Sequence, residues 1–124
     1  MGDPLLLWGK SGSSGTPHPL RYHMMDSGMV AKALLITPQW RRIRALLVRL
    51  GGLDALALDS TVPFLVALHD IGKAAPGFQR VVPALWDVVR AGGFADCHPL
   101  WNGVRFRHDV EGYVALADQV LPTW

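Results

Sequence analysis

The sequence predicts an all-α protein, a compact bundle of about five helices that forms a single domain over residues 1–124. Apolar residues recur at the spacing of one helix face, for example at Leu20, Met24 and Leu34. Prolines and paired glycines separate these stretches, as expected at helix ends. No stretch alternates apolar and polar residues in the way that is typical of a strand.

The predicted helices follow an irregular stretch over residues 1–19. Pro38 ends the first helix, and Gly51 with Gly52 closes the second. The fourth helix starts at Pro83, because proline suits the first turn. In order, the helices are expected at about residues 20–35, 40–50, 60–70, 83–91 and 108–121.

The third helix contains an apolar run, Val62 to Leu68. Ser60 or Thr61 can cap its start, with Pro63 in the first turn. We expect this helix to carry His69 and Asp70 at its end.

The composition limits the class of protein. The chain has 124 residues, of which 50% are apolar and 18% charged, so it can fold around one core. A net charge of +2 and a pI near 9.0 are compatible with nucleic acid. One cysteine, Cys97, cannot form an internal disulfide or a Cys-based zinc site, which fits a reducing, cytoplasmic setting. We expect no signal peptide and no membrane span, since no apolar run approaches ~20 residues.

The motif His-Asp-Ile-Gly-Lys, at residues 69–73, follows an apolar run directly. A neutral imidazole at His69 can bind a transition metal, and the two carboxylate oxygens of Asp70 can bridge two metals. Lys73 can reach an anionic substrate that the metals hold. A capped helix end with a hydrogen-bonded histidine is the alternative interpretation of the two residues alone.

Histidines on three predicted helices strengthen the metal hypothesis. His23, His69 and His108 each lie near an apolar stripe, and buried imidazoles need polar partners. We therefore predict a histidine-rich site for one or two metal ions with His23, His69, Asp70 and His108 as ligands. Such a site supplies hydroxide for hydrolysis, and a phosphoester is the natural substrate.

Two basic stretches are open to two interpretations. Lys10 and Ser11 lie in a glycine- and serine-rich stretch, which is either a solvated loop or a place where these side chains touch a phosphate. The arginines of the second helix form a basic face that we interpret as a solvated surface: Arg41, Arg42, Arg44 and Arg49.

Several segments share the order and spacing of one known family. They are Leu7-Trp8-Gly9-Lys10-Ser11, His18-Pro19-Leu20, Tyr22-His23-Met24-Met25-Asp26, Ala67 to Lys73, Phe78-Gln79 and Arg107-His108. With these segments the chain resembles the N-terminal HD-type nuclease domain of the CRISPR-associated helicase-nuclease of type I systems, the Cas-three family. The resemblance implies an HD-type helical domain that hydrolyses phosphodiester bonds of single-stranded DNA in antiviral defence.

The resemblance also implies roles for individual residues. His23 and the His69-Asp70 pair would hold one metal, and Asp70 would bridge to a second metal that His108 also binds. Asp70 and Lys73 are then the expected catalytic residues, and Lys73 would steady a phosphate. Lys10 and Ser11 match the opening motif as candidate substrate contacts.

The family domain is longer than this chain. It carries a further pair of adjacent histidines and a later aspartate beyond the last helix, so residues 1–124 are expected to be truncated at the C-terminus. His98, within a predicted loop over residues 94–106, Asp109, Glu111 or water could fill the open positions. The sequence also lacks the phosphate loop of a helicase motor.

Three functions are compatible with these features. The first is a metal-dependent nuclease that works on single-stranded DNA with a helicase domain or subunit and a CRISPR surveillance complex. The second is a truncated, non-catalytic module that binds the surveillance complex or another partner. The third is a nucleotide phosphohydrolase. Histidine and carboxylate ligands suit iron, manganese, cobalt, nickel or zinc as the divalent ion.

Overall fold

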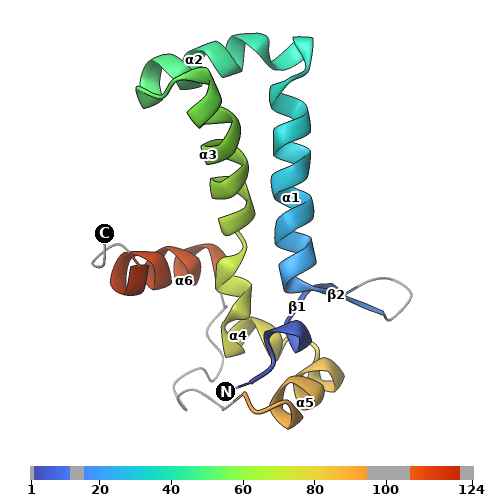
Figure 1. Cartoon of the computed structure of the whole chain (residues 1–124). Helices are drawn as coiled ribbons and strands as arrows, with labels where there is room; N and C mark the ends of the chain where they lie inside the picture. Colours follow the sequence, from blue (N-terminus) through green and yellow to red (C-terminus); the bar gives the residue numbers. More distant parts are fainter. Residues whose placement is uncertain (1, 12–15, 95–106, 121–124) are drawn as a thin grey trace. The chain divides into compact units, whose positions relative to one another are not determined.

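A computed structural model of the chain describes residues 2–11, 16–94 and 107–120 (Figure 1). The contacts divide the chain into two compact units. Unit one is formed by residues 1–23 with 69–124, and unit two by residues 24–68. The single domain predicted from the sequence stays a prediction.

The described residues are helical apart from one two-stranded antiparallel sheet, so the all-α fold class is confirmed. Short 3-10 turns (η1 to η3) and a final π-helical turn (η5) connect or extend the helices. In chain order the elements are η1 Pro4–Leu6, β1 Trp8–Ser11, β2 Pro17–Pro19, α1 Leu20–Leu35, η2 Pro38–Trp40, α2 Arg41–Gly51, α3 Ala55–Leu68, η3 Ile71–Ala74, α4 Pro76–Gln79, α5 Pro83–Ala91, α6 His108–Ala115 and η5 Leu116–Val120.

The expectation of an irregular N-terminal stretch was wrong for β1 and β2. Lys10 pairs with His18, and Ser11 with Pro17, in an antiparallel ladder. The backbone N–H of Leu20 donates to the carbonyl of Leu7 at 2.7 Å, which ties the start of α1 to the start of β1. Strands this short have too few residues to show alternation in the sequence. They form because pairing with each other stabilises them.

The third helix, α3, begins earlier than predicted. It starts at Ala55, and the Asp54 carboxylate accepts a hydrogen bond from the Ala57 N–H at 2.7 Å, so Asp54 caps the helix in place of Ser60 or Thr61. Pro63 consequently lies inside the helix and not in its first turn. The helix ends at Leu68, which leaves the His-Asp pair on the turn that follows.

Within unit two, α1 and α3 lie side by side (Figure 1). Gly28 makes this approach possible, because a Cβ atom there would lie 2.9 Å from the carbonyl oxygen of Pro63 and 3.2 Å from Cβ of Ala67. Arg44 of α2 binds Asp59 of α3 with two bonds of 2.9 and 2.8 Å from Nη2 to the carboxylate oxygens. Arg44, which was predicted to lie on a solvated face, therefore links α2 to α3.

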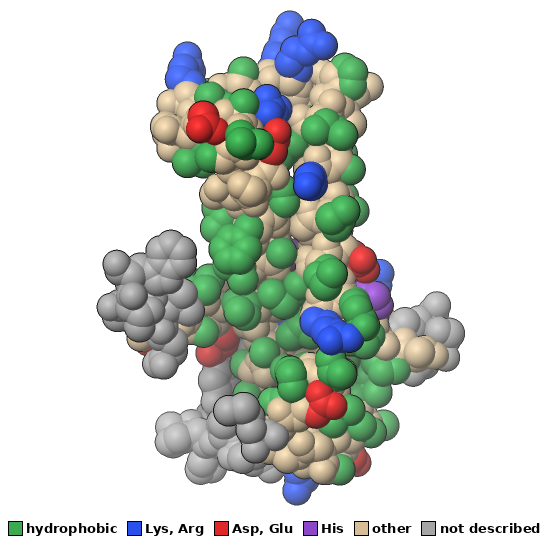
Figure 2. Space-filling view, viewed as in Figure 1, with side chains coloured by type: hydrophobic (Ala, Val, Ile, Leu, Met, Phe, Trp, Pro, Cys, Tyr) green, Lys and Arg blue, Asp and Glu red, His purple; other side chains and the backbone are tan. Residues whose placement is uncertain are grey.

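Much of the apolar surface of unit two is exposed. Figure 2 shows hydrophobic side chains along α1 and α3. The most exposed of these are Leu56, Met29, Met25, Val30, Phe64 and Leu65.

One helical stretch of the described residues, Ala55–Ala74, is long and apolar enough to cross a membrane by length and composition. The expectation that no apolar stretch approaches this length was therefore wrong. The stretch includes Asp59, which is paired with Arg44, and Asp70, which is paired with Lys73. Because charged side chains are costly in hydrocarbon, these ion pairs favour a helix within a folded protein over a membrane span.

The core of unit one surrounds the first strand. Trp8 is buried, and its ring packs on Phe78 with centroids 4.6 Å apart. The other buried apolar side chains of this unit are Leu7, Leu20, Trp86 and Val89. These contacts hold β1, α4 and α5 around the segment that follows Asp70.

Two glycines let η3 and α6 approach closely. A Cβ atom on Gly72 would lie 1.8 Å from the carbonyl oxygen of His108, and one on Gly112 would lie 3.1 Å from the Gly72 nitrogen. Gly72 thus serves the close packing of η3 on α6. This backbone contact places His108 beside the His-Asp motif.

We expect Gly72→Ala to destabilise the chain by about 2 kcal/mol, because the added methyl group meets backbone that cannot turn aside. Urea denaturation followed by circular dichroism measures the free energy of unfolding. Gly51→Ala is the matched control, since its Cβ would meet only Leu53 side-chain atoms at 3.6 Å or more. Equal stability of the two variants would contradict the close packing of η3 on α6.

Candidate metal centre

The strand β1 positions the first histidine of the candidate site. His23 is on the first turns of α1, and a Cβ atom on Gly9 would lie 2.9 Å from Cβ of His23. Glycine at this point of the opening motif therefore lets the strand backbone lie against the imidazole. The sequence contains Gly9 within its Trp-Gly-Lys-Ser segment, but only the packing shows its role.

The turn between α3 and η3 presents the other members of the site. His69 and Asp70 occupy this turn, and Asp70 immediately precedes η3. Lys73 follows on η3, and its N–H donates to the Asp70 carbonyl at 2.9 Å. The first residue of α6, His108, reaches the same place through the contact of α6 with Gly72.

The three predicted histidine ligands converge within unit one on the carboxylate of the fourth predicted ligand, Asp70. Its Oδ2 lies 2.9 Å from Nε2 of His23 and 3.2 Å from Nε2 of His69. Its Oδ1 lies 3.4 Å from Nε2 of His108. Lys73 joins the group, with Nζ 2.9 Å from Oδ2. The two oxygens of one carboxylate thus face different histidines.

Burial and charge set the protonation states of this cluster. Asp70 is only 2% exposed. Burial raises the pKa of its carboxyl group, but the hydrogen bond and charge of Lys73, with the charges of His69 and His23, outweigh burial and leave that pKa below its usual value. Burial, and then the charge of Lys73, lowers the pKa of His23. An ionised carboxylate and a neutral imidazole are the forms that bind metal.

Each histidine nitrogen lies at a distance from an Asp70 oxygen that two ligands of one metal ion can have. Two ligands at about 2.1 Å from one ion, at angles of 90 to 110°, lie roughly 3.0 to 3.4 Å apart. The distances from the Asp70 oxygens to the three histidine nitrogens are 2.9 to 3.4 Å. Within the described ranges, however, no group of three or more His, Cys, Asp or Glu side chains could hold an ion as it stands. The metal role of the four ligands stays a prediction.

The other candidate residues lie apart from the cluster. Lys10 and Ser11 are exposed on β1, and the structure describes no contact from either to Asp70. The carboxylate of Asp109 pairs with Arg107, whose hydrogen bond lowers the pKa of Asp109. Glu111 lines a separate pocket of about 440 Å³ beside η3 and α6. His98 lies outside the described residues.

Gln79 is a residue whose role the sequence did not reveal. It is fully buried, at 0% exposure. Its Oε1 accepts from the Trp8 N–H at 3.1 Å, and its Nε2 donates to the carbonyls of Trp8 and Lys73 at 2.8 and 2.7 Å. One amide therefore joins the opening Trp-Gly-Lys-Ser segment to the backbone that carries Lys73. Its place directly after Phe78 in the quoted motif was the available hint.

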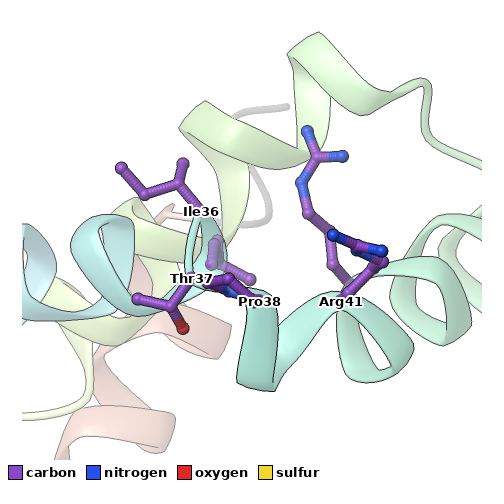
Figure 3. Close-up of a pocket in the computed structure, with 6 residues that line it drawn as sticks. Ile36, Thr37, Pro38 and Arg41 are labelled. Atoms are coloured by element: carbon purple, nitrogen blue, oxygen red, sulfur yellow. The ribbon is translucent and has the colours of Figure 1, made fainter.

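A pocket of about 320 Å³ in unit two is distinct from the cluster (Figure 3). Its Thr37 hydroxyl donates to the Leu34 carbonyl at 2.8 Å, and its Arg44 is held by Asp59, so much of its polar lining is already bonded. The pocket contains none of the predicted site residues. It is lined by Leu35, Ile36, Thr37, Pro38, Arg41 and Arg44.

The fold and the cluster together define a class of protein. A helical chain in which a His-Asp pair meets two further histidines has the features of an HD domain. The chain belongs to the family described as Cas3, HD domain, which matches residues 8–124. This confirms the resemblance found in the sequence.

One curated relative is similar to part of the chain. Over 76 residues the chain is 45% identical to the CRISPR-associated endonuclease/helicase Cas3 of Thermus thermophilus. The aligned part covers 60% of this chain and 8% of that protein, so the chain corresponds to a small fraction of its relative. No solved structure matches the chain.

Proposed function

We propose that this chain is the metal-dependent nuclease part of a CRISPR-associated nuclease-helicase and hydrolyses phosphodiester bonds of single-stranded DNA. The convergence of His23, His69 and His108 on the two oxygens of Asp70 is the observation that carries this proposal. Nucleotide hydrolysis is a weaker candidate, because the match to the Cas3 HD family extends over residues 8–124 and not only over the His-Asp motif.

The two carboxylate oxygens of Asp70 face different histidines, and this arrangement supports a site for two ions. His23 and His69 lie near Oδ2 of Asp70 and would hold one divalent ion with it. His108 lies near Oδ1 and would hold the second. When bound, such ions lower the pKa of coordinated water and neutralise phosphate charge. Iron, manganese, cobalt, nickel and zinc all suit these ligands.

The chain's own groups would orient the substrate. The ammonium group of Lys73, on the flexible stem of that side chain, can donate to a non-bridging phosphate oxygen. The Nε2 atoms of the three histidines and the oxygens of Asp70 face one place, so these four residues would share the ions. The exposed Lys10 and Ser11 are proposed as contacts to a more distant phosphate. A helicase domain or subunit and a surveillance complex are the proposed partners.

Cleavage assays with the full chain test this function. Labelled single-stranded DNA, the matching duplex and free nucleotides are each incubated with manganese, cobalt or nickel. We expect cutting of single-stranded DNA that requires metal and stops with a chelator. Faster turnover of free nucleotides would favour the phosphohydrolase. No cutting, together with capture by a surveillance complex, would favour the non-catalytic module.

A further inference from the structure

Lys73 occupies an unusual place for a substrate-binding residue. Its Nζ lies 2.9 Å from Oδ2 of Asp70 and 3.1 Å from Nε2 of His23. Its side chain is only 13% exposed, and Nζ lies 5.6 Å from the centre of the Phe78 ring. The ammonium group is thus held inside the cluster and not extended towards solvent.

The contact with His23 uses the atom that a metal needs. An ammonium group only donates hydrogen bonds, so Nε2 of His23 can accept one from Lys73 in the tautomer whose proton is on Nδ1, whereas in the other tautomer this nitrogen donates to Oδ2 of Asp70, 2.9 Å away. A metal ion binds imidazole through the lone pair that accepts the bond from Lys73. Oδ2 of Asp70 is likewise shared between Lys73 and the predicted ion. Lys73 in this position therefore competes with a metal for Oδ2 of Asp70 and, in the tautomer protonated on Nδ1, for Nε2 of His23.

We propose that Lys73 fills the cation position of this site in the metal-free chain, and that an arriving metal displaces its ammonium group. The inference rests on the metal site of the proposed function. In the metal-free state the ammonium balances the buried charge of Asp70, which is costly to leave unpaired. Once displaced, the same group is free to reach a phosphate, because the lysine stem has four flexible carbons.

If the metal displaces Lys73, the substitution Lys73→Met should lower the thermal stability of the metal-free chain and raise its affinity for metal. Lys73→Met keeps an unbranched apolar side chain but removes the charge. The metal-free variant is expected to unfold at a lower temperature than the wild type. Its affinity for cobalt is expected to rise about tenfold, since no charged hydrogen bond has to be broken before the ion binds.

Isothermal titration of each full chain with Co²⁺ measures this affinity. Lys32→Met is the matched control, because Lys32 is exposed on α1 and distant in sequence from the cluster, and its affinity should equal that of the wild type. Cobalt binding to Lys73→Met that is equal to, or weaker than, wild-type binding would overturn the proposal. So would the failure of every variant to bind cobalt.

A second measurement needs no substitution. Reductive methylation followed by mass spectrometry reports the exposure of each lysine, and Lys10 and Lys32 serve as internal references. Lys73 should be modified slowly in the metal-free wild type and severalfold faster when Co²⁺ is added, whereas the reference lysines should not change. An unchanged rate at Lys73 would overturn the proposal. Neither readout depends on cleavage, so a chain that exchanges Lys73 for cobalt but cuts no DNA would contradict only the nuclease function.

Discussion

Asp70→Asn is expected to lower metal-dependent cleavage of single-stranded DNA by at least about 100-fold, since loss of a group that only supports a ligand already costs 10- to 100-fold. The asparagine side chain would keep the shape of the aspartate but lose its negative charge and one acceptor oxygen. Three imidazoles and one ammonium group meet at this carboxylate, so no other described group can take over its position. Initial rates at several manganese concentrations measure the effect.

Asp109→Asn is the matched control for this substitution. Asp109 follows His108 directly, but its carboxylate is exposed and paired with Arg107. Its cleavage rate should stay within about twofold of the wild type, because a surface ion pair contributes little. Cleavage by Asp70→Asn within tenfold of the wild type would remove Asp70 from the centre of the mechanism.

Gln79→Ala is expected to destabilise the chain by about 3 kcal/mol or more, because it leaves several buried backbone groups without partners. The lost bonds join Gln79 to the N–H and carbonyl of Trp8 and to the carbonyl of Lys73. None of these groups can recover a bond from water without opening the core of unit one. Urea denaturation monitored by tryptophan fluorescence measures the free energy of unfolding.

Gln39→Ala provides the comparison for Gln79. Gln39 is exposed on η2, so its loss should change the free energy of unfolding by no more than about 0.5 kcal/mol. Gln79→Glu separates the two ends of the amide, since it keeps an acceptor for Trp8 but cannot donate to the two carbonyls when ionised. A cost below about 1 kcal/mol for Gln79→Ala would mean that Gln79 does not hold β1 to the site.

The types and positions of individual residues allowed the histidine cluster to be predicted from the sequence. His69 and Asp70 stand beside each other after an apolar run, and His23 and His108 flank other apolar stripes. Imidazole and carboxylate groups near a core need polar partners, so they could be expected to meet. The structure brings them within 3.4 Å of the Asp70 carboxylate. Lys73 was expected to face a substrate, and its contact with His23 depends on packing that no spacing in the sequence specifies.

The sequence by itself determined the helical class and most helix positions, because apolar periodicity and proline or glycine breaks act within a few residues of each other. It also led to the prediction that histidine and aspartate side chains are the ligands of a metal site. Tertiary structure alone decided the pairing of β1 with β2, the burial of Gln79 and the close contact of Gly72 with α6. Each of these depends on groups far apart in the chain. Residues that lie far apart in the chain leave no local pattern in the sequence. Their hydrogen bonds are satisfied only when the packing is complete. The same packing leaves no space for a side chain at Gly72.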